Sequence, residues 1–218
     1  MRVFILDFDG TLGDTTNIIV ETMMQTIDAL QLPKRTREQC TAMIGLPLKK
    51  TFTELYKDFD STVVDDDMGE RCAETYRRLF DQNNTPGAVP LFPKVRETLL
   101  ELHRRGAMLT IASSRSSDTL NGYMKSLHLD DIITYIVAAD NVTNAKPHAE
   151  PVLKTIAENN LLPDDCIVVG DTSFDILMAH NAGVKAVGVT YGNGKREDLE
   201  TVNAEYIIDD FSKLLELC

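Results

Sequence analysis

Short apolar runs alternate with helical patterns along most of the chain. Between the runs, apolar residues recur at helical spacing, as in Val95, Leu99 and Leu102. Alternating strands and helices predict an α/β fold, a doubly wound parallel sheet with both faces covered. Five runs have the length and composition of buried strands: residues 2–7, 107–112, 134–139, 166–170 and 185–189.

Residues 15–87 follow a different pattern. Ile19, Met23 and Ile27 mark one helical face, and no strand-like alternation stands out in this stretch. We therefore predict an all-helical domain at 15–87, inserted into a Rossmann-like core formed by 1–14 and 88–218. Its connections would lie near 13–16 and within 83–90, a stretch rich in Asn, Gly and Pro.

Composition indicates an ordinary globular protein. The 218 residues are 43% hydrophobic and 26% charged. No apolar stretch reaches the roughly 18 residues of a membrane span, and a strand-like run begins at once, which leaves no room for a signal peptide. The scattered cysteines at 40, 72, 166 and 218 indicate reduced thiols and a cytoplasmic location.

The net charge of −12 argues against a nucleic-acid or anionic-membrane partner. It does not exclude a small phosphate substrate, because distant surface charge is screened beyond about 8 Å. We expect a small phosphorylated metabolite as the partner, and a monomer or weak homodimer.

Two carboxylates follow the first strand-like run directly. Asp7 and Asp9 are two residues apart, and the Gly10-Thr11 step after them indicates a turn. They converge at the carboxyl edge of the sheet, where open α/β folds bind ligands. Two charges there are unfavourable without a cation, and a divalent metal with oxygen ligands would supply one.

Three more polar positions follow apolar runs in a fixed order. Asp171 and Asp175 come after the run at 166–170; if Ser173 caps a helix there, Asp175 lies in its first turn. Ser113 ends the run at 107–112, and Lys146 precedes a proline. Alone, each is more often a turn, a cap or a solvated side chain. Together they give the order acid pair, hydroxyl, lysine, acid pair.

This order resembles the signature of the haloacid dehalogenase-like hydrolase superfamily, over nearly the whole chain. The chain is most similar to the branch with a helical cap inserted after the first acid pair, which contains phosphoglycolate phosphatases and β-phosphoglucomutases. Two departures, Lys94 where many relatives have Gly and Gly13 where a larger apolar residue is common, do not touch the expected chemistry. Similar stretches also occur at residues 43–48, 92–93, 104–106 and 179–183.

The resemblance implies a Mg²⁺-dependent phosphatase that forms an aspartyl-phosphate. Asp7 would be the nucleophile, and Asp9 the general acid and then the general base. Ser113 would donate a hydrogen bond to the transferring phosphoryl group, and Lys146 would balance its charge.

The same resemblance implies the metal ligands. Asp7, the backbone carbonyl of Asp9, and Asp171 would bind Mg²⁺. Asp175 would act directly or through a water molecule. Three further residues are expected near the substrate phosphate: Gly10, Thr11 and Ser114.

Substrate choice is expected to depend on the cap. Lys49 and Lys50 lie in a stretch similar to the family's specificity segment, where a lysine would meet a substrate carboxylate. They fit an exposed pair at the start of a helix equally well. With few aromatic residues in the cap, we favour a small acidic phosphate such as 2-phosphoglycolate; phosphosugars, nucleotides and pyrophosphate stay open.

Other activities in the superfamily fit less well. Asp9 distinguishes the chain from the dehalogenases and phosphonate-cleaving members, which lack an acid there. The mutases carry a histidine early in the first cap helix, where this chain has Ile18-Ile19-Val20. A hexose-phosphate mutase, an inorganic pyrophosphatase and a catalytically silent binding module remain the alternatives.

Overall fold

The computed structural model describes residues 2–57, 64–85 and 87–217. The chain divides into two compact units. One combines Met1–Asp14 with Leu91–Cys218, and the other is the continuous stretch Thr15–Pro90.

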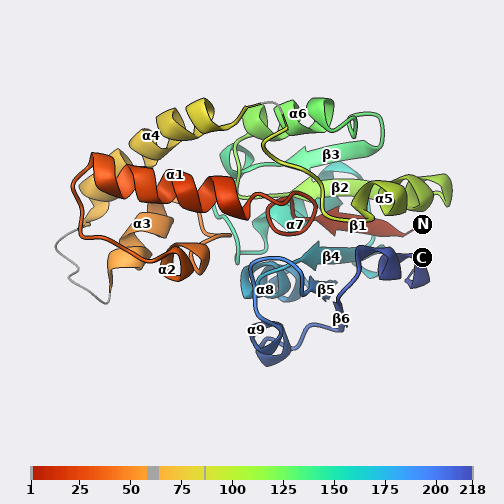
Figure 1. The fold of residues 1–218 in the computed structure, drawn as a ribbon. Helices are drawn as coiled ribbons and strands as arrows, with labels where there is room; N and C mark the ends of the chain where they lie inside the picture. Colours follow the sequence, from red (N-terminus) through yellow and green to blue (C-terminus); the bar gives the residue numbers. More distant parts are fainter. Residues whose placement is uncertain (1, 58–63, 86, 218) are drawn as a thin grey trace. The chain divides into compact units, whose positions relative to one another are not determined.

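The larger unit contains a six-stranded parallel sheet in the order β3-β2-β1-β4-β5-β6 (Figure 1). The predicted α/β fold with a doubly wound parallel sheet is confirmed, and so are all five expected strands. The sixth strand was not predicted, because three residues of mixed exposure give too short a pattern. The strands are β1 (Val3–Leu6), β2 (Met108–Ala112), β3 (Ile133–Val137), β4 (Cys166–Gly170), β5 (Lys185–Val189) and β6 (Tyr206–Ile208).

Helices flank this sheet, and the apolar residues predicted from periodicity face it. Val152, Ile176 and Leu199, each from a different helix, pack in one core with alternate residues of β1 and β4. Burying such side chains stabilises the unit by about 25 cal/mol per Å². The helices are α5 (Val95–Arg104), α6 (Ser117–Ser126), α7 (Glu150–Glu158), α8 (Ser173–Asn181) and α9 (Arg196–Thr201), with 3₁₀ helices η1 (Ala139–Asn141), η2 (Pro163–Asp165) and η3 (Phe211–Glu216).

The strand order reverses between β1 and β4, which are neighbours at the centre of the sheet. Their pairing continues one residue beyond β1, because the amide of Asp7 donates a hydrogen bond of 2.9 Å to the carbonyl of Val169. The carboxyl ends of these two strands therefore lie side by side. In open α/β sheets, this reversal point is where ligands bind.

Lys94, the residue that caps the start of α5, has a left-handed backbone conformation with φ of 64°. This backbone conformation favours glycine, which explains why glycine suits the position. The Lys94 ammonium forms an ion pair with Asp210, so its side chain joins the start of α5 to the residue before η3.

The smaller unit is helical in its described residues. It contains α1 (Thr16–Ala29), α2 (Arg37–Thr41), α3 (Leu48–Lys57) and α4 (Asp66–Asn83). Asp65 caps the start of α4, where its side chain accepts a hydrogen bond from the amide of Met68. The hydrophobic core of this unit includes Ile19, Met23, Ile27, Cys40, Phe52, Tyr56, Cys72, Tyr76 and Phe80.

Three cysteines, Cys40, Cys72 and Cys166, are free and buried; Cys218 lies outside the described residues. Within residues 2–57, 64–85 and 87–217, no helix combines the length and apolar character needed to cross a bilayer.

Candidate active site

Three carboxylates and one ammonium meet at the carboxyl ends of β1 and β4. Asp7, Asp171 and Asp175 are buried, and each offers an oxygen within 4.8 Å of the others. Nζ of Lys146 lies 2.7 Å from Oδ1 of Asp7 and 2.6 Å from Oδ1 of Asp175. The structure thus brings together four of the expected site residues from distant parts of the chain.

Burial controls the protonation of this group. It raises the pKa of Asp7 well above its ordinary range; Lys146 opposes the shift and the neighbouring carboxylates add to it. Burial, followed by the charge of Asp175, raises the pKa of Asp171 to about 7. Burial alone would lower the pKa of Lys146, but the carboxylates of Asp175 and Asp7 raise it above its ordinary value. Lys146 therefore stays protonated and charged, whereas burial favours the neutral, protonated form of Asp7 and Asp171.

The donor set fits a divalent cation with a preference for oxygen. When all four side chains are ionised, three carboxylates and one ammonium leave two negative charges uncompensated. Buried charge of this kind is unfavourable unless a cation joins it. Mg²⁺ carries the matching charge and takes carboxylate oxygens.

Both oxygens of Asp175 are already held by the protein. Oδ1 accepts from Lys146, and Oδ2 accepts from the amide and hydroxyl of Thr172 at 3.1 and 2.8 Å. Thr172 and Asp175 form the capping box of α8. Ser173 is the first helical residue, and the capping position that we considered for it is held by Thr172. Asp175 is in the first turn, as expected.

Asp171 is held by a loop that follows β5, at residues 190–194. Its Oδ2 accepts from the amide of Asn193 at 2.6 Å and from the side-chain amide at 3.2 Å. A Cβ on Gly192 would lie 2.4 Å from the same oxygen, so only glycine fits there. Tyr191 donates a hydrogen bond of 2.9 Å to the carbonyl of Thr11. Sequence reasoning missed this loop, whose residues are typical of any surface turn.

Gly10 and Thr11 form the tight turn that follows the first two acids, Asp7 and Asp9. Gly10 has φ of +79°, and a Cβ there would lie 2.0 Å from Oδ2 of Asp171. We expected the amides of both residues near the phosphate. In the structure they donate within the turn, Gly10 to Gly13 at 3.0 Å and Thr11 to Phe8 at 3.4 Å. The hydroxyl of Thr11 contacts Oδ1 of Asp171 at 3.3 Å.

Asp9 is paired with an arginine that the sequence did not single out. Nε of Arg115 lies 2.8 Å from both carboxylate oxygens of Asp9. Arg115 follows Ser113 by two residues, and its amide donates to the Ser113 hydroxyl at 3.3 Å. Ser113 itself is buried after β2, and the adjacent Ser114 is half-buried. The segment after β2 thus contributes both a serine and an arginine to this edge of the sheet.

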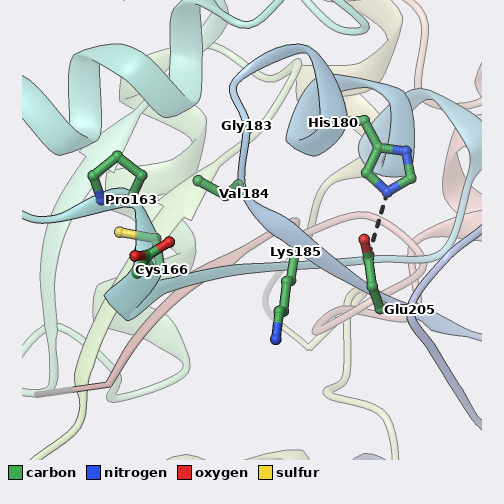
Figure 2. A pocket seen from close by; sticks show the side chains of 8 residues that line it. Pro163, Cys166, His180, Gly183, Val184, Lys185 and Glu205 are labelled. Atoms are coloured by element: carbon green, nitrogen blue, oxygen red, sulfur yellow. Dashed lines mark hydrogen bonds and ion pairs between the residues drawn. The ribbon is translucent and has the colours of Figure 1, made fainter.

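Lys49 and Lys50 belong to the other unit. Both are exposed in the first turn of α3. The larger unit also has a depression of about 410 Å³ away from the acid cluster. Figure 2 shows it at the amino ends of β4 and β5, with Cys166, Lys185 and the His180–Glu205 pair in its lining. The depression lies at the opposite end of the strands from Asp171, so it is separate from the acid cluster.

The central carboxyl edge of the parallel sheet thus carries a cluster of acids and a buried lysine. The family model of the haloacid dehalogenase-like hydrolases matches residues 4–189. The chain belongs to this family. Over the full chain it is 31% identical to pyrophosphatase PpaX of Anoxybacillus flavithermus, with 96% of that protein covered. It is 32% identical to the probable phosphatase IndB of Dickeya dadantii, covering 97% of this chain and 90% of that one.

Solved structures show the same fold. A candidate haloacid dehalogenase-like hydrolase from Bacteroides fragilis superposes with a TM-score of 0.90 at 25% identity, over 98% of this chain and 99% of that one. A hydrolase from Pseudomonas syringae gives a TM-score of 0.87 at 26% identity, over 99% and 97% of the two chains. The topology is therefore that of family members over their whole length.

Proposed function

We propose that the protein is a Mg²⁺-dependent phosphatase that acts on a small phosphorylated metabolite through an aspartyl-phosphate. One observation carries the proposal: Lys146 lies between Asp7 and Asp175, with Asp171 completing a buried acid cluster. Family membership agrees with hydrolysis. The position of the cluster, at the reversal of the strand order, agrees with ligand binding.

Asp7 is the proposed nucleophile. A carboxylate oxygen attacks phosphorus, the new oxygen–phosphorus bond forms, and the bond to the leaving oxygen breaks. Negative charge then moves from Asp7 to the phosphoryl oxygens. Lys146 is 2.7 Å from Asp7 and fully charged, so it stabilises the charge at both stages.

Asp9 is the proposed proton carrier. It gives a proton to the leaving oxygen in the first step and takes one from water in the second. The activated water attacks phosphorus, inorganic phosphate leaves, and the Asp7 carboxylate is restored. Ser113, whose hydroxyl lies at the same edge, would hold the transferring group during both steps.

Asp7 and Asp171 are the carboxylates proposed to hold the metal. When bound, Mg²⁺ would neutralise charge and orient the phosphoryl group. Lys146 and Thr172 engage the two oxygens of Asp175. Asp175 would therefore orient the neighbouring groups without binding the metal directly, or would bind it through a water molecule.

Two substrate classes are proposed, each with its own support. A carboxylated phosphate such as phosphoglycolate fits the lysine pair Lys49 and Lys50, if the helical unit serves as a specificity cap. Pyrophosphate is supported by the relatives named pyrophosphatase, which match this chain over its full length. In both classes the group that leaves is a small anion.

The test is steady-state hydrolysis of p-nitrophenyl phosphate, phosphoglycolate, pyrophosphate and a hexose phosphate, each with Mg²⁺ and with EDTA. We expect Mg²⁺-dependent turnover of p-nitrophenyl phosphate and the highest kcat/KM for one of the two small acidic substrates. Absence of Mg²⁺-dependent turnover on every substrate would overturn the proposal and favour a silent binding module. Isomerisation of the hexose phosphate would favour a mutase.

A further inference from the structure

The side chains of Asp9 and Arg115 form a nearly buried ion pair. Nε of Arg115 is 2.8 Å from Oδ1 and from Oδ2 of Asp9, and the two side chains are 12% (Asp9) and 11% (Arg115) exposed. Asp9 lies in the turn after β1, and Arg115 lies between β2 and α6. One N–H donor is shared between both carboxylate oxygens, and this charge-assisted contact holds the carboxylate against the guanidinium.

Two aromatic rings hold the arginine in place. Cζ of Arg115 lies 5.4 Å from the centre of the Tyr123 ring, within the range of a cation–π contact. The Tyr123 ring stacks on Phe8, with centroids 4.9 Å apart and planes 11° from parallel. Phe8 is the residue between Asp7 and Asp9. The brace therefore connects Arg115 back to the backbone that carries both acids.

Proton transfer requires a proton carrier that is held within hydrogen-bond reach of the reacting oxygen. A carboxylate on a turn can rotate about two side-chain bonds, and a misplaced proton donor loses much of its rate advantage. Asp7 is held by strand pairing and by Lys146. Asp9 has left the sheet, so its own side-chain contacts must hold it.

We propose that Arg115 is a positioning residue for Asp9, braced by Tyr123 and Phe8. The proposal rests on the proposed function, in which Asp9 transfers the proton. Arg115 acts through Asp9: it holds the carboxylate where the leaving oxygen meets it, and it leaves the nucleophilic attack by Asp7 unchanged.

This role predicts a dependence on the leaving group. A p-nitrophenolate leaves without a proton, whereas an alkoxide requires one. Arg115→Met should therefore reduce kcat for an alkyl phosphate by roughly ten- to hundredfold, within the ~10²–10⁴ that proton transfer as a whole supplies. It should change p-nitrophenyl phosphate turnover by less than about threefold. Arg115→Lys should recover part of the alkyl phosphate activity, because an ammonium can still donate to one oxygen.

The experiment is a double-mutant cycle on the intact protein with Mg²⁺. The wild type, Asp9→Asn, Arg115→Met and the double variant are assayed on p-nitrophenyl and glycerol phosphates. If Arg115 acts only through Asp9, adding Arg115→Met to Asp9→Asn causes no further loss. Tyr123→Leu, which removes the brace but keeps the ion pair, should give the same substrate pattern more weakly. Arg196→Met, at an exposed helix pair, is the matched control and should change neither substrate.

Each outcome decides a different point. Additive losses would show that Arg115 acts on the substrate itself, and equal losses on both substrates would indicate a structural role; either overturns the inference. Full activity of Arg115→Met on glycerol phosphate does so as well. If Asp9→Asn itself shows no leaving-group effect, the proposed role of Asp9 fails. If Arg115→Met does not fold, Arg115→Lys and Tyr123→Leu carry the test by the same substrate pattern.

Discussion

The backbone amide of Asn193 donates a hydrogen bond of 2.6 Å to Oδ2 of Asp171, across 22 residues of sequence. The loop after β5 thereby fixes the acid that ends β4. The contact occupies one oxygen of Asp171 and orients the other, at 3.3 Å from the Thr11 hydroxyl. The position of a proposed metal ligand thus depends on a loop that bears no carboxylate.

The loop should set the Mg²⁺ requirement. Asn193→Ala removes the side-chain donor but keeps the backbone amide, so a modest rise in the Mg²⁺ concentration for half activity is expected. Gly192→Ala should raise it much more, because its Cβ would lie 2.2 Å from the Gly10 carbonyl and 2.4 Å from Asp171. Gly122→Ala, where a Cβ meets nothing within 4 Å, is the control. Mg²⁺ activation curves distinguish the three, and an unchanged curve for Gly192→Ala would contradict the expectation.

The nucleophile can be tested by covalent labelling. Asp7→Asn should abolish turnover and eliminate labelling from ³²P-substrate, because an amide does not attack phosphorus. The change is nearly isosteric, so circular dichroism should show a folded protein. Asp164→Asn, at an exposed acid away from the cluster, should retain both turnover and labelling. Labelling of the Asp7→Asn variant would place the nucleophile elsewhere.

Substitutions of Asp171 and Asp175 should have different effects. Asp171→Ala should mainly raise the Mg²⁺ requirement. Asp175→Ala should mainly lower the free energy of unfolding, by about 3 kcal/mol, because it removes a partner of buried Lys146 and the capping box of α8. Urea unfolding and Mg²⁺ titration separate the effects. Glu200→Ala, which breaks an exposed pair, should lower stability by under about 1 kcal/mol. The reverse ranking would exchange the two roles.

Stability without metal should fall as pH rises. Asp171 has a pKa of about 7 in the folded chain, against an ordinary value of 3.8. Between these values the unfolded chain releases the proton while the folded chain keeps it, so ionisation favours unfolding. Mg²⁺ replaces the proton, so its stabilising effect should be larger at pH 8 than at pH 5. Thermal melts with EDTA or Mg²⁺ at both pH values check this; an equal Mg²⁺ effect at both would count against it.

The lysine pair tests the substrate class. Replacing Lys49 and Lys50 with Ala should lower kcat/KM for phosphoglycolate by at least about tenfold, if a desolvated charge pair is lost. It should barely change p-nitrophenyl phosphate, which has no carboxylate. Lys57→Ala, at the exposed end of the same helix, is the control. Equal values for wild type and variant on phosphoglycolate would leave pyrophosphate as the better candidate.

Much of the fold was predictable because buried strands and helices have strong apolar periodicity. Five strands, and the position of Asp7 and Asp171 just after the carboxyl ends of two of them, follow from that pattern. The site was only partly predictable. Arg115 pairs with an acid 106 residues earlier, and Asn193 reaches Asp171 through a loop. Neither residue belongs to a periodic pattern; their contacts exist only once β2 and β5 have joined the sheet.

The order of these contacts along the chain has a consequence for protein synthesis. The group that surrounds Asp171 draws on Thr11 near one end of the chain and on Asn193 near the other. A growing polypeptide that has emerged only through α7 contains Asp7, Ser113 and Lys146 but lacks β4, β5 and the loop after them. On the proposed mechanism, no ribosome-bound fragment of that length can hydrolyse a phosphate. Catalytic capacity would arrive only after β5 and the loop that follows it have emerged.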